Sequence, residues 1–267
     1  MFIKIIDCFI FYNEINLLTY RLNILNDIVD KFVIVESTHT FSGKEKKLYF
    51  NENKHLFEKF NEKIIHIIVE DFPFKYPNIN YKNNEQWVNE KFQRDKISSG
   101  IDTLKLDSND ILIITDLDEI PDPKTLRNIK DKHITISINT LEMDFYYYNL
   151  NTKQNIKWTL GKIVSYGKYK EIATSCSNIR GLNCVKISNS GWHLSYFGDS
   201  KFIQNKIQHF SHQEYNYEHF TDLSKIEERV KKSSDIFENH SNITKINIKD
   251  NNYLPTDYDK YLTQFYI

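Results

Sequence analysis

Residues 111–121 read Ile-Leu-Ile-Ile-Thr-Asp-Leu-Asp-Glu-Ile-Pro, and they give the clearest indication of the fold class. Four apolar residues, three of them β-branched, predict a buried strand that ends in three carboxylates before Pro121 stops the hydrogen-bond ladder. Asp116 and Asp118 are two positions apart, so on an extended backbone both side chains point the same way and can reach one divalent cation. Open α/β sheets bind ligands at this end of their strands. The alternative is a solvated connection whose carboxylates cap the next helix.

A cation bound by Asp116 and Asp118 would neutralise a diphosphate, so the pattern indicates a metal-dependent enzyme with a nucleotide-activated substrate. His193 is a candidate third metal ligand, because it lies among aromatic residues with glycines on both sides. A half-buried histidine with one backbone hydrogen bond fits that pattern equally well. His209 and His212 are one helical turn apart and allow a second metal site, but a polar helix end is the better interpretation.

The segments around this strand alternate between strand and helix patterns. Before it we expect strands at residues 2–12, 32–36 and 63–69, and helices at 15–29 and 84–98. After it we expect a short helix at 123–130, strands at 134–138 and 141–150, and helices at 199–212 and 223–237. A strand-helix-strand unit of this kind implies parallel pairing. The predicted fold is therefore α/β, with a Rossmann-like, mostly parallel central sheet flanked by helices and a mixed second half.

The simplest organisation is one domain over residues 1–267. Its first half, 1–121, would bind a nucleotide, and its second half, 122–267, would shape the site of an acceptor. We find no internal repeat and no low-complexity linker. At 267 residues the chain is long enough for one large α/β domain.

Composition excludes some classes of function. The formal net charge is −1, which gives no general electrostatic basis for binding nucleic acid. Aromatic residues make up 14% of the chain, which fits a surface that stacks on sugars or bases. No segment approaches the roughly 18 uninterrupted apolar residues of a membrane span, and there is no signal-peptide pattern. A cytoplasmic protein is the expectation, and the oligomeric state stays open.

The three cysteines are odd in number and lack metal-binding spacing. Cys8 lies in an expected buried strand and is interpreted as a small core residue. A disulfide between Cys176 and Cys184 is possible, but a sequence cannot establish it.

Further polar residues are candidates for ligand contact. Asn13 and Glu14 follow the first expected strand and would emerge at the ligand-binding edge, where they can hydrogen-bond a nucleobase. Arg94 either binds a phosphate oxygen or pairs with Glu90 or Asp95 on its own helix. The chain has no Gly-x-Gly-x-x-Gly, Walker-type Gly-Lys-Ser/Thr or Gly-x-Ser-x-Gly sequence. This removes the usual dinucleotide loop, ATP loop and nucleophile elbow.

Taken in order, these motifs resemble glycosyltransferase family 17, which includes enzymes that add N-acetylglucosamine to the β-mannose of N-glycans. No single motif is decisive, but five in the same order are hard to obtain by chance. The resemblance is carried by residues 6–14 (IDCFIFYNE), 32–36 (FVIVE) with 40–44 (TFSGK), 93–95 (QRD), 115–121 (TDLDEIP) and 191–195 (GWHLS).

The resemblance implies a GT-A type fold, a UDP-sugar donor and an inverting transfer, with Mn²⁺ or Mg²⁺ at the Asp-Leu-Asp motif. Asp116 and Asp118 become ligands of the metal and the donor diphosphate, and His193 completes the metal shell. The residues implied around the uridine are Asn13, Glu14 and Glu36. The acceptor would be a glycan or another hydroxyl compound, and the transferred sugar N-acetylglucosamine.

An inverting transfer needs a base behind the anomeric carbon to take the proton of the acceptor hydroxyl. Glu214 and Glu119 are the candidates, in that order, although Glu119 can instead orient the metal ligands. Two other functions stay open: a different metal-dependent nucleotide enzyme, such as a nucleotidyltransferase or phosphohydrolase, and a glycan-binding module without catalysis. Product analysis separates the enzymes, and a thermal shift with UDP and Mn²⁺ tests the binding module.

Overall fold

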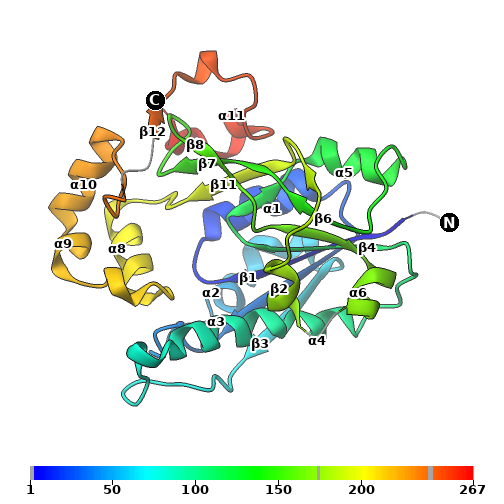
Figure 1. Ribbon diagram of the computed structural model, residues 1–267, viewed down its shortest axis with the longest axis horizontal. Helices are drawn as coiled ribbons and strands as arrows, with labels where there is room; N and C mark the ends of the chain where they lie inside the picture. Colours follow the sequence, from blue (N-terminus) through cyan, green and yellow to red (C-terminus); the bar gives the residue numbers. More distant parts are fainter. Residues whose placement is uncertain (1–2, 173–174, 240–242, 267) are drawn as a thin grey trace.

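The architecture is two β-sheets surrounded by helices (Figure 1), seen in a computed structural model that describes residues 3–172, 175–239 and 243–266. The larger sheet has seven strands in the order β10-β6-β9-β4-β1-β2-β3. Its strands are β1 (Ile5–Phe11), β2 (Lys31–Ser37), β3 (Ile64–Val69), β4 (Ile111–Asp116), β6 (Ile138–Leu141), β9 (Lys162–Ser165) and β10 (Lys186–Ile187). Strands β3, β2, β1 and β4 are parallel, and β9 is antiparallel to its neighbours β4 and β6. The α/β class predicted from the sequence is confirmed.

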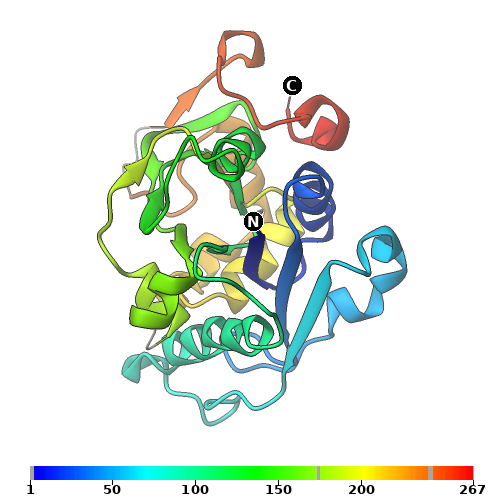
Figure 2. The same ribbon diagram turned by 90° about the vertical axis from the view of Figure 1, so that its right-hand side faces the viewer.

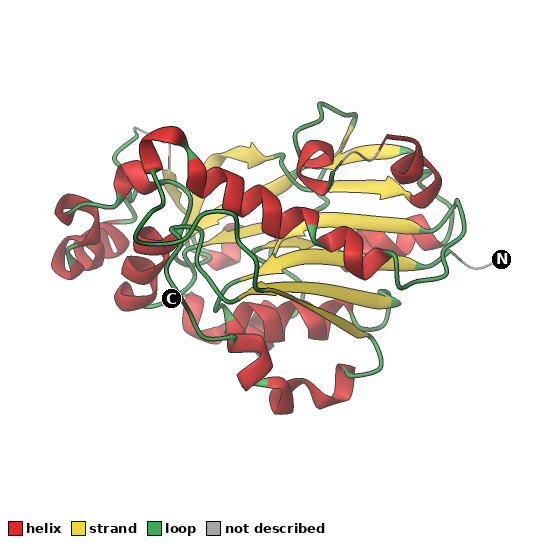
Figure 3. Cartoon of the chain, turned by 90° about the horizontal axis from the view of Figure 1, so that it is seen from below, coloured by secondary structure: helices red, strands yellow, loops and turns green. Residues whose placement is uncertain are grey.

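The first strand shows why this sheet is buried on both faces. Ile5 and Phe9 of β1 pack into a core cluster shared with α1 (Ile15–Leu25), whereas Ile6 and Cys8 pack into a second cluster shared with α4 (Ile97–Ile101). Successive side chains of a strand point to opposite faces, so a continuous apolar run supplies both cores. Helices α3 (Glu85–Asp95) and α4 cross one face of the sheet in the view of Figure 3.

The second sheet has five strands in the order β12-β8-β7-β11-β5. They are β5 (Glu119–Pro121), β7 (Met143–Tyr147), β8 (Thr152–Trp158), β11 (Gly191–Ser195) and β12 (Ile243–Lys245). Because β4 ends at Asp116 and β5 begins at Glu119, the acidic motif lies where one sheet passes into the other. Gly191 has φ +153°, and a Cβ atom there would lie 2.2 Å from the carbonyl oxygen of Ile120. The glycine therefore permits the close approach of β11 to β5.

A group of helices forms one end of the molecule, at the left of Figure 1 and behind the sheets in Figure 2. It comprises α8 (Ser200–His209), α9 (Glu218–Thr221) and α10 (Leu223–Lys232). This group has an apolar cluster of its own, made of Tyr148, Tyr196, Ile203, Ile207, Phe220, Ile226, Ile236 and Phe237. The remaining α-helices are α2 (Tyr49–Glu52), α5 (Pro123–Lys130), α6 (Tyr166–Ile172), α7 (Cys176–Arg180) and α11 (Tyr258–Tyr261). No helix in the described ranges has the length and apolarity to cross a membrane.

Several predicted elements need correction. The strand expected at 134–138 is wrong: the chain there is a loop, Ile136 is buried in the core, and β6 begins only at Ile138. The expected helix at 84–98 is broken into α3 and α4. The helix expected at 223–237 ends at Lys232, since Ser233 is left-handed with φ +53°. Residue 2 of the first expected strand lies outside the described residues.

The thiols behave as separate groups. Cys176 and Cys184 are both free, so the possible disulfide between them is not formed. Cys8 is fully buried in β1, which confirms its interpretation as a core residue. Burial raises the pKa of the Cys176 thiol to about 12, so it is a neutral packing group.

Candidate functional site

The acidic turn, residues 116–119, is held from beneath by Arg21 of α1. Its guanidinium donates to the carbonyl oxygens of Asp116, Leu117 and Glu119 at 2.8, 2.9 and 3.0 Å. It also pairs with Asp7 of β1 at 2.6 Å, and both side chains are fully buried. Because the carbonyl oxygens of the turn face the core, the backbone is fixed while Asp116 and Asp118 line the cavity.

Asp116 lies between two arginines from different helices. Its Oδ1 accepts from Arg94 of α3 at 3.0 Å, and its Oδ2 accepts from Arg180 of α7 at 2.7 Å. Burial by itself raises the pKa of this carboxyl group, but Arg180 and Arg94 outweigh that effect and hold the pKa below its usual value. Asp116 is therefore an anion with both oxygens already paired.

Asp118 faces a different pair of partners. Lys206 of α8 donates to its Oδ2 at 2.9 Å, and the Nε2 atom of His193 lies 3.5 Å from its Oδ1. Burial opposes ionisation, yet Lys206 and His193 hold the pKa of Asp118 far below its usual range. The His193 ring stacks on Phe145 at 4.7 Å and lies 4.1 Å from the ring of Trp158. Its buried Nδ1 has no hydrogen-bond partner.

Glu119 is fully buried and faces four donors. Arg180 donates to both of its oxygens, at 2.6 Å to Oε2. Trp158 donates to Oε1 at 2.5 Å, and the backbone N–H of Asp116 donates to Oε2 at 2.9 Å. These bonds occupy the lone pairs of the carboxylate, so Glu119 is placed to fix the acidic turn and Arg180.

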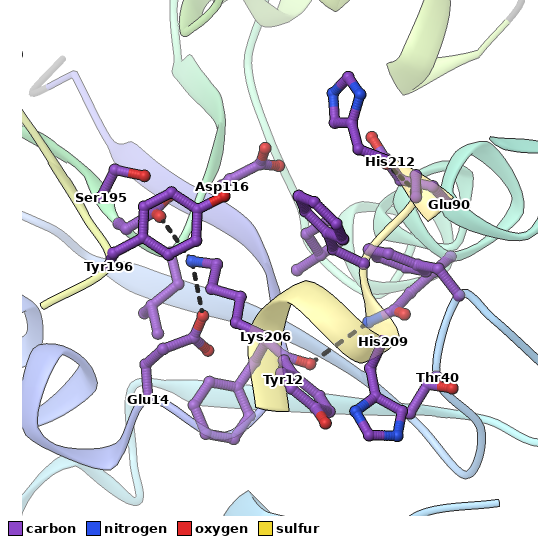
Figure 4. Close-up of a pocket in the computed structure, with 18 of the residues that line it drawn as sticks. Tyr12, Glu14, Thr40, Glu90, Asp116, Ser195, Tyr196, Lys206, His209 and His212 are labelled. Carbon is purple, nitrogen blue, oxygen red and sulfur yellow. Dashed lines mark hydrogen bonds and ion pairs between the residues drawn. The ribbon is translucent and has the colours of Figure 1, made fainter. Parts of the chain in front are cut away.

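The carboxylates open into a cavity of about 440 Å³. In Figure 4, Thr40 and His209 lie on one side of the cavity, and Ser195 and Tyr196 lie on the opposite side. Aromatic residues add apolar wall, among them Trp87, Phe145, Tyr147, Trp158, Tyr215 and Phe237. The volume and mixed lining suit a polar ligand with a flat ring and a charged centre.

The residues predicted around a nucleoside are only partly brought together. Glu14 lines the cavity, and its Oε1 lies 3.3 Å from the Nζ atom of Lys206. Asn13 lies beside it, and its amide donates to Asn205 at 3.4 Å. Glu36 lies behind the wall: it accepts from the N–H of Phe50 at 2.9 Å and is fully buried. Among these three, Glu14 is the residue that faces the cavity.

Lys46 connects Glu36 to the cavity. Its Nζ lies 3.7 Å from Oε1 of Glu36, and it approaches the rings of Tyr12 and Tyr49 at 5.6 and 5.4 Å. Burial lowers the pKa of Lys46 to about 8, against the opposing influence of Glu36 and Glu14. Lys46 is therefore mostly charged at neutral pH and loses its proton at mildly alkaline pH.

Glu214 does not line the cavity itself. Its side chain is 55% exposed and lies 2.7 Å from the Nδ1 atom of His212, which does line the cavity. His209 is separate, because its Nδ1 bonds to the carbonyl oxygen of Asn205 at 2.7 Å. The pattern of His209 and His212 is therefore a helix end, and the described residues contain no group of three or more His, Cys, Asp or Glu side chains arranged to hold a metal ion.

Two ligand atoms nevertheless fit a divalent cation that the donor would help to hold. The 3.5 Å between Asp118 Oδ1 and His193 Nε2 is close to the separation of neighbouring ligands that each lie about 2.1 Å from one metal ion. The partnerless Nδ1 of His193 leaves the tautomer of the ring free to expose Nε2 as a ligand. Asp118 and His193 are the residues that fit a metal, whereas Asp116 is engaged by arginines.

Sequence reasoning missed four basic or positioning residues: Arg21, Lys46, Arg180 and Lys206. Arg21 had a signal, since it interrupts the apolar stripe of α1, where a charged residue needs a buried partner. Arg180 had only an indirect sequence signal, through Asp95 in the run Gln93-Arg94-Asp95. Asp95 accepts from the N–H of Ser177 at 2.8 Å and so fixes the start of α7, the helix that carries Arg180.

Comparison with known proteins identifies the class. The profile of glycosyltransferase family 17 matches residues 2–243, which is most of the chain. The chain belongs to glycosyltransferase family 17.

Curated relatives are more distant and longer. The chain is 30% identical over 122 residues to the β-1,4-mannosyl-glycoprotein 4-β-N-acetylglucosaminyltransferases of Rattus norvegicus and Homo sapiens. The aligned stretch covers 44% of this chain and 22% of each relative. The chain therefore matches about a fifth of the length of these relatives.

Proposed function

We propose that the protein is a metal-dependent inverting glycosyltransferase that moves N-acetylglucosamine from a UDP-sugar to a hydroxyl group of a glycan. The observation that carries this proposal is a single cavity that joins Asp118 and His193 to an aromatic wall. The names of the relatives support the choice of sugar. A GT-A type arrangement is the fold that this function implies.

The charges around the cavity support metal dependence. Among the described residues, four carboxylates and four basic side chains line the cavity, a net charge of zero with neutral histidines: Glu14, Glu90, Asp116 and Asp118 against Lys46, Arg94, Arg180 and Lys206. A donor diphosphate adds about two negative charges to a site of low dielectric, which is costly without a counter-charge. One divalent cation, bound together with the donor, restores the balance.

Asp118 and His193 would hold this cation, Mn²⁺ or Mg²⁺. When bound, the ion offsets the negative charge that develops on the departing UDP. The chain itself would hold the ligand-binding groups in place, because Arg21 fixes the acidic turn and Glu119 fixes Arg180. Arg94 and Asp116 would lie beside the diphosphate, and Asn13, Glu14 and Glu36 on the uridine side, where Glu36 acts through Lys46.

We assign the proton transfer to His212 and Glu214 together. The Nδ1–H of His212 donates to Glu214 in the tautomer that this contact favours, which leaves Nε2 free to accept a proton. As the acceptor oxygen bonds to the anomeric carbon, its proton passes to Nε2 and the bond from that carbon to UDP breaks. Glu214 thus acts by orienting His212. Glu119, the second candidate base, keeps its positioning role, since its oxygens are already bonded.

The decisive experiment is a screen of UDP-sugars and GDP-sugars for donor hydrolysis with and without Mn²⁺. We expect UDP-N-acetylglucosamine to be hydrolysed with release of UDP only when the metal is present. Acceptor trials with mannose-containing oligosaccharides should then show sugar incorporation with inverted anomeric configuration by NMR. Hydrolysis of a GDP-sugar alone would overturn the donor assignment. Release of pyrophosphate or inorganic phosphate would instead support a nucleotidyltransferase or a phosphohydrolase.

A further inference from the structure

Lys206 occupies the space between two carboxylates that follow different strands of the nucleotide half, Glu14 after β1 and Asp118 after β4. Its Nζ lies 2.9 Å from Oδ2 of Asp118 and 3.3 Å from Oε1 of Glu14. It also lies 5.5 Å from the centre of the Tyr196 ring. The side chain is 18% exposed, and Figure 4 shows it extending from its helix towards Glu14. Asp118 and Glu14 thus share one ammonium group.

The position of Lys206 differs from that of the arginines in the site. Arg180 is fixed by two hydrogen bonds to the carboxylate of Glu119 and by its contact with Asp116. Lys206 instead belongs to α8, which packs through Ile203 and Ile207 into the separate apolar cluster of the helical end. Its ammonium group is a compact point charge on a flexible stem, so it can change partners without moving the helix.

We propose that Lys206 is a built-in substitute for the divalent cation: it holds Asp118 when the metal is absent and passes to the donor diphosphate when the metal binds. This inference rests on the proposed function, because it presumes a metal at Asp118 and His193. The carboxylate of Asp118 then exchanges one counter-charge for another, and the released ammonium group gains the phosphate oxygens as partners.

Two opposite effects follow from this exchange. Without the donor, Lys206 competes with the metal, because a positive charge next to Asp118 repels a divalent ion and occupies a ligand oxygen. With the donor, Lys206 assists binding, because it adds an ammonium-to-phosphate contact. A residue that merely stabilised the fold would weaken both kinds of binding together.

The test is a pair of affinities measured for Lys206→Met. The affinity for Mn²⁺ alone, followed by the electron paramagnetic resonance signal of free Mn²⁺, should tighten at least about tenfold. The affinity for UDP at saturating Mn²⁺, measured by calorimetry, should weaken about tenfold. Lys201→Met is the matched control, since Lys201 lies exposed on the same helix, and it should change neither value. Lys206→Arg keeps the charge and should retain weak binding of Mn²⁺ alone.

A thermal melt checks that the Lys206→Met variant is folded. Lys206→Met leaves Asp118 and Glu14 without their shared cation, so Mn²⁺ should raise the melting temperature of the variant more than that of the unsubstituted protein. Equal Mn²⁺ affinity in both proteins would overturn the role of Lys206 and leave the proposed function intact. If neither protein binds Mn²⁺ even in the presence of UDP, the metal dependence of the proposed function fails and the inference falls with it.

Discussion

The floor and the helical wall of the cavity are built in opposite ways. The floor is the acidic turn, residues 116–119, and Arg21 ties its carbonyl oxygens to the core through a fully buried ion pair with Asp7. The wall is the helical end, which has a core of its own and reaches the nucleotide half through polar side chains. Its contacts include Tyr12 with Asn205 at 2.6 Å and Lys206 with Glu14.

The difference shows which part of the site is fixed in advance. A buried network in which each guanidinium N–H meets an oxygen allows one arrangement, so the floor can present the metal and diphosphate ligands with little reorganisation. Side-chain contacts across a cavity are more easily exchanged. The helical wall is therefore suited to admit, hold and release ligands, and the floor to the chemistry.

The largest effect expected is on activity and tests the floor. Asp118→Ala removes a metal ligand and should lower metal-dependent turnover by about ten thousandfold or more, which corresponds to at least about 5 kcal/mol. Steady-state kinetics at saturating Mn²⁺ would measure this loss. Asp131→Ala, at an exposed helix end, is the control and should keep full activity. Normal turnover in the Asp118 variant would show that the acidic turn takes no part in the mechanism.

The next effect tests whether the floor is rigid because of its buried pair. Arg21→Met leaves Asp7 buried and unpaired and frees three carbonyl oxygens, so the free energy of unfolding should fall by about 3 to 5 kcal/mol. Urea unfolding followed by circular dichroism gives this value. Arg127→Met on the exposed face of α5 should change it by less than about 0.5 kcal/mol. A similarly small change for Arg21→Met would contradict the comparison between floor and wall.

A third prediction concerns Lys46 and the dependence of stability on pH. Its pKa is lowered to about 8 in the folded protein from 10.5, so between these values the unfolded chain binds more protons. Stability therefore rises with pH across this window, by up to about 3 kcal/mol, and is lowest where Lys46 is charged in both states. Unfolding free energies at pH 7.5 and 9, below the range in which the buried tyrosines titrate in the unfolded chain, should show about 1 kcal/mol of this rise, and Lys46→Met should abolish it. If the unfolding free energy of the variant still rises with pH, another titratable group causes the rise.

The smallest effect is expected at the rim of the helical wall. His212→Ala should lower kcat by about a hundredfold, because it removes the proposed base, while stability hardly changes at an exposed position. Glu214→Gln, which keeps a hydrogen bond to the ring but loses the charge, should cost less. The measurement is kcat at saturating donor and acceptor, with thermal melting as the check on folding. Unchanged kcat in both variants would mean that another residue is the base.

Much of the nucleotide half was readable from local patterns. Largely apolar runs such as 5–11, broken only by Asp7, and 111–114 predicted strands because both faces of the sheet are covered by helices. Asp116 and Asp118, predicted at the ligand-binding end of a buried strand, both line the cavity. The run at 134–138 alternates like a strand but is a loop up to residue 137: Ile136 is buried in the core there without strand pairing, and pairing begins only at Ile138 of β6. Periodicity records burial and cannot by itself identify the hydrogen-bond partner.

Partners far apart in the chain could not be predicted. Glu119 looked like a base because sequence shows only that it follows the aspartates, whereas its four donors include Arg180, 61 positions away. Glu214 looked like a base in its own right, whereas its contact is with His212. Lys206 gave no signal at all, because a lysine on a predicted helix is ordinarily solvated.

Local patterns of residues are enough to predict an α/β chain with a carboxylate pair at the end of a buried strand, and the order of the motifs indicates glycosyltransferase family 17. These features are local, since strand burial and side-chain direction follow from the order of residues. Only the tertiary structure decided what charge each carboxylate faces: two arginines for Asp116, Lys206 and His193 for Asp118, and Arg180 for Glu119. The physical reason is that ion pairing depends on distances of a few ångströms, which residues distant in the chain acquire only when the sheets and helices pack together.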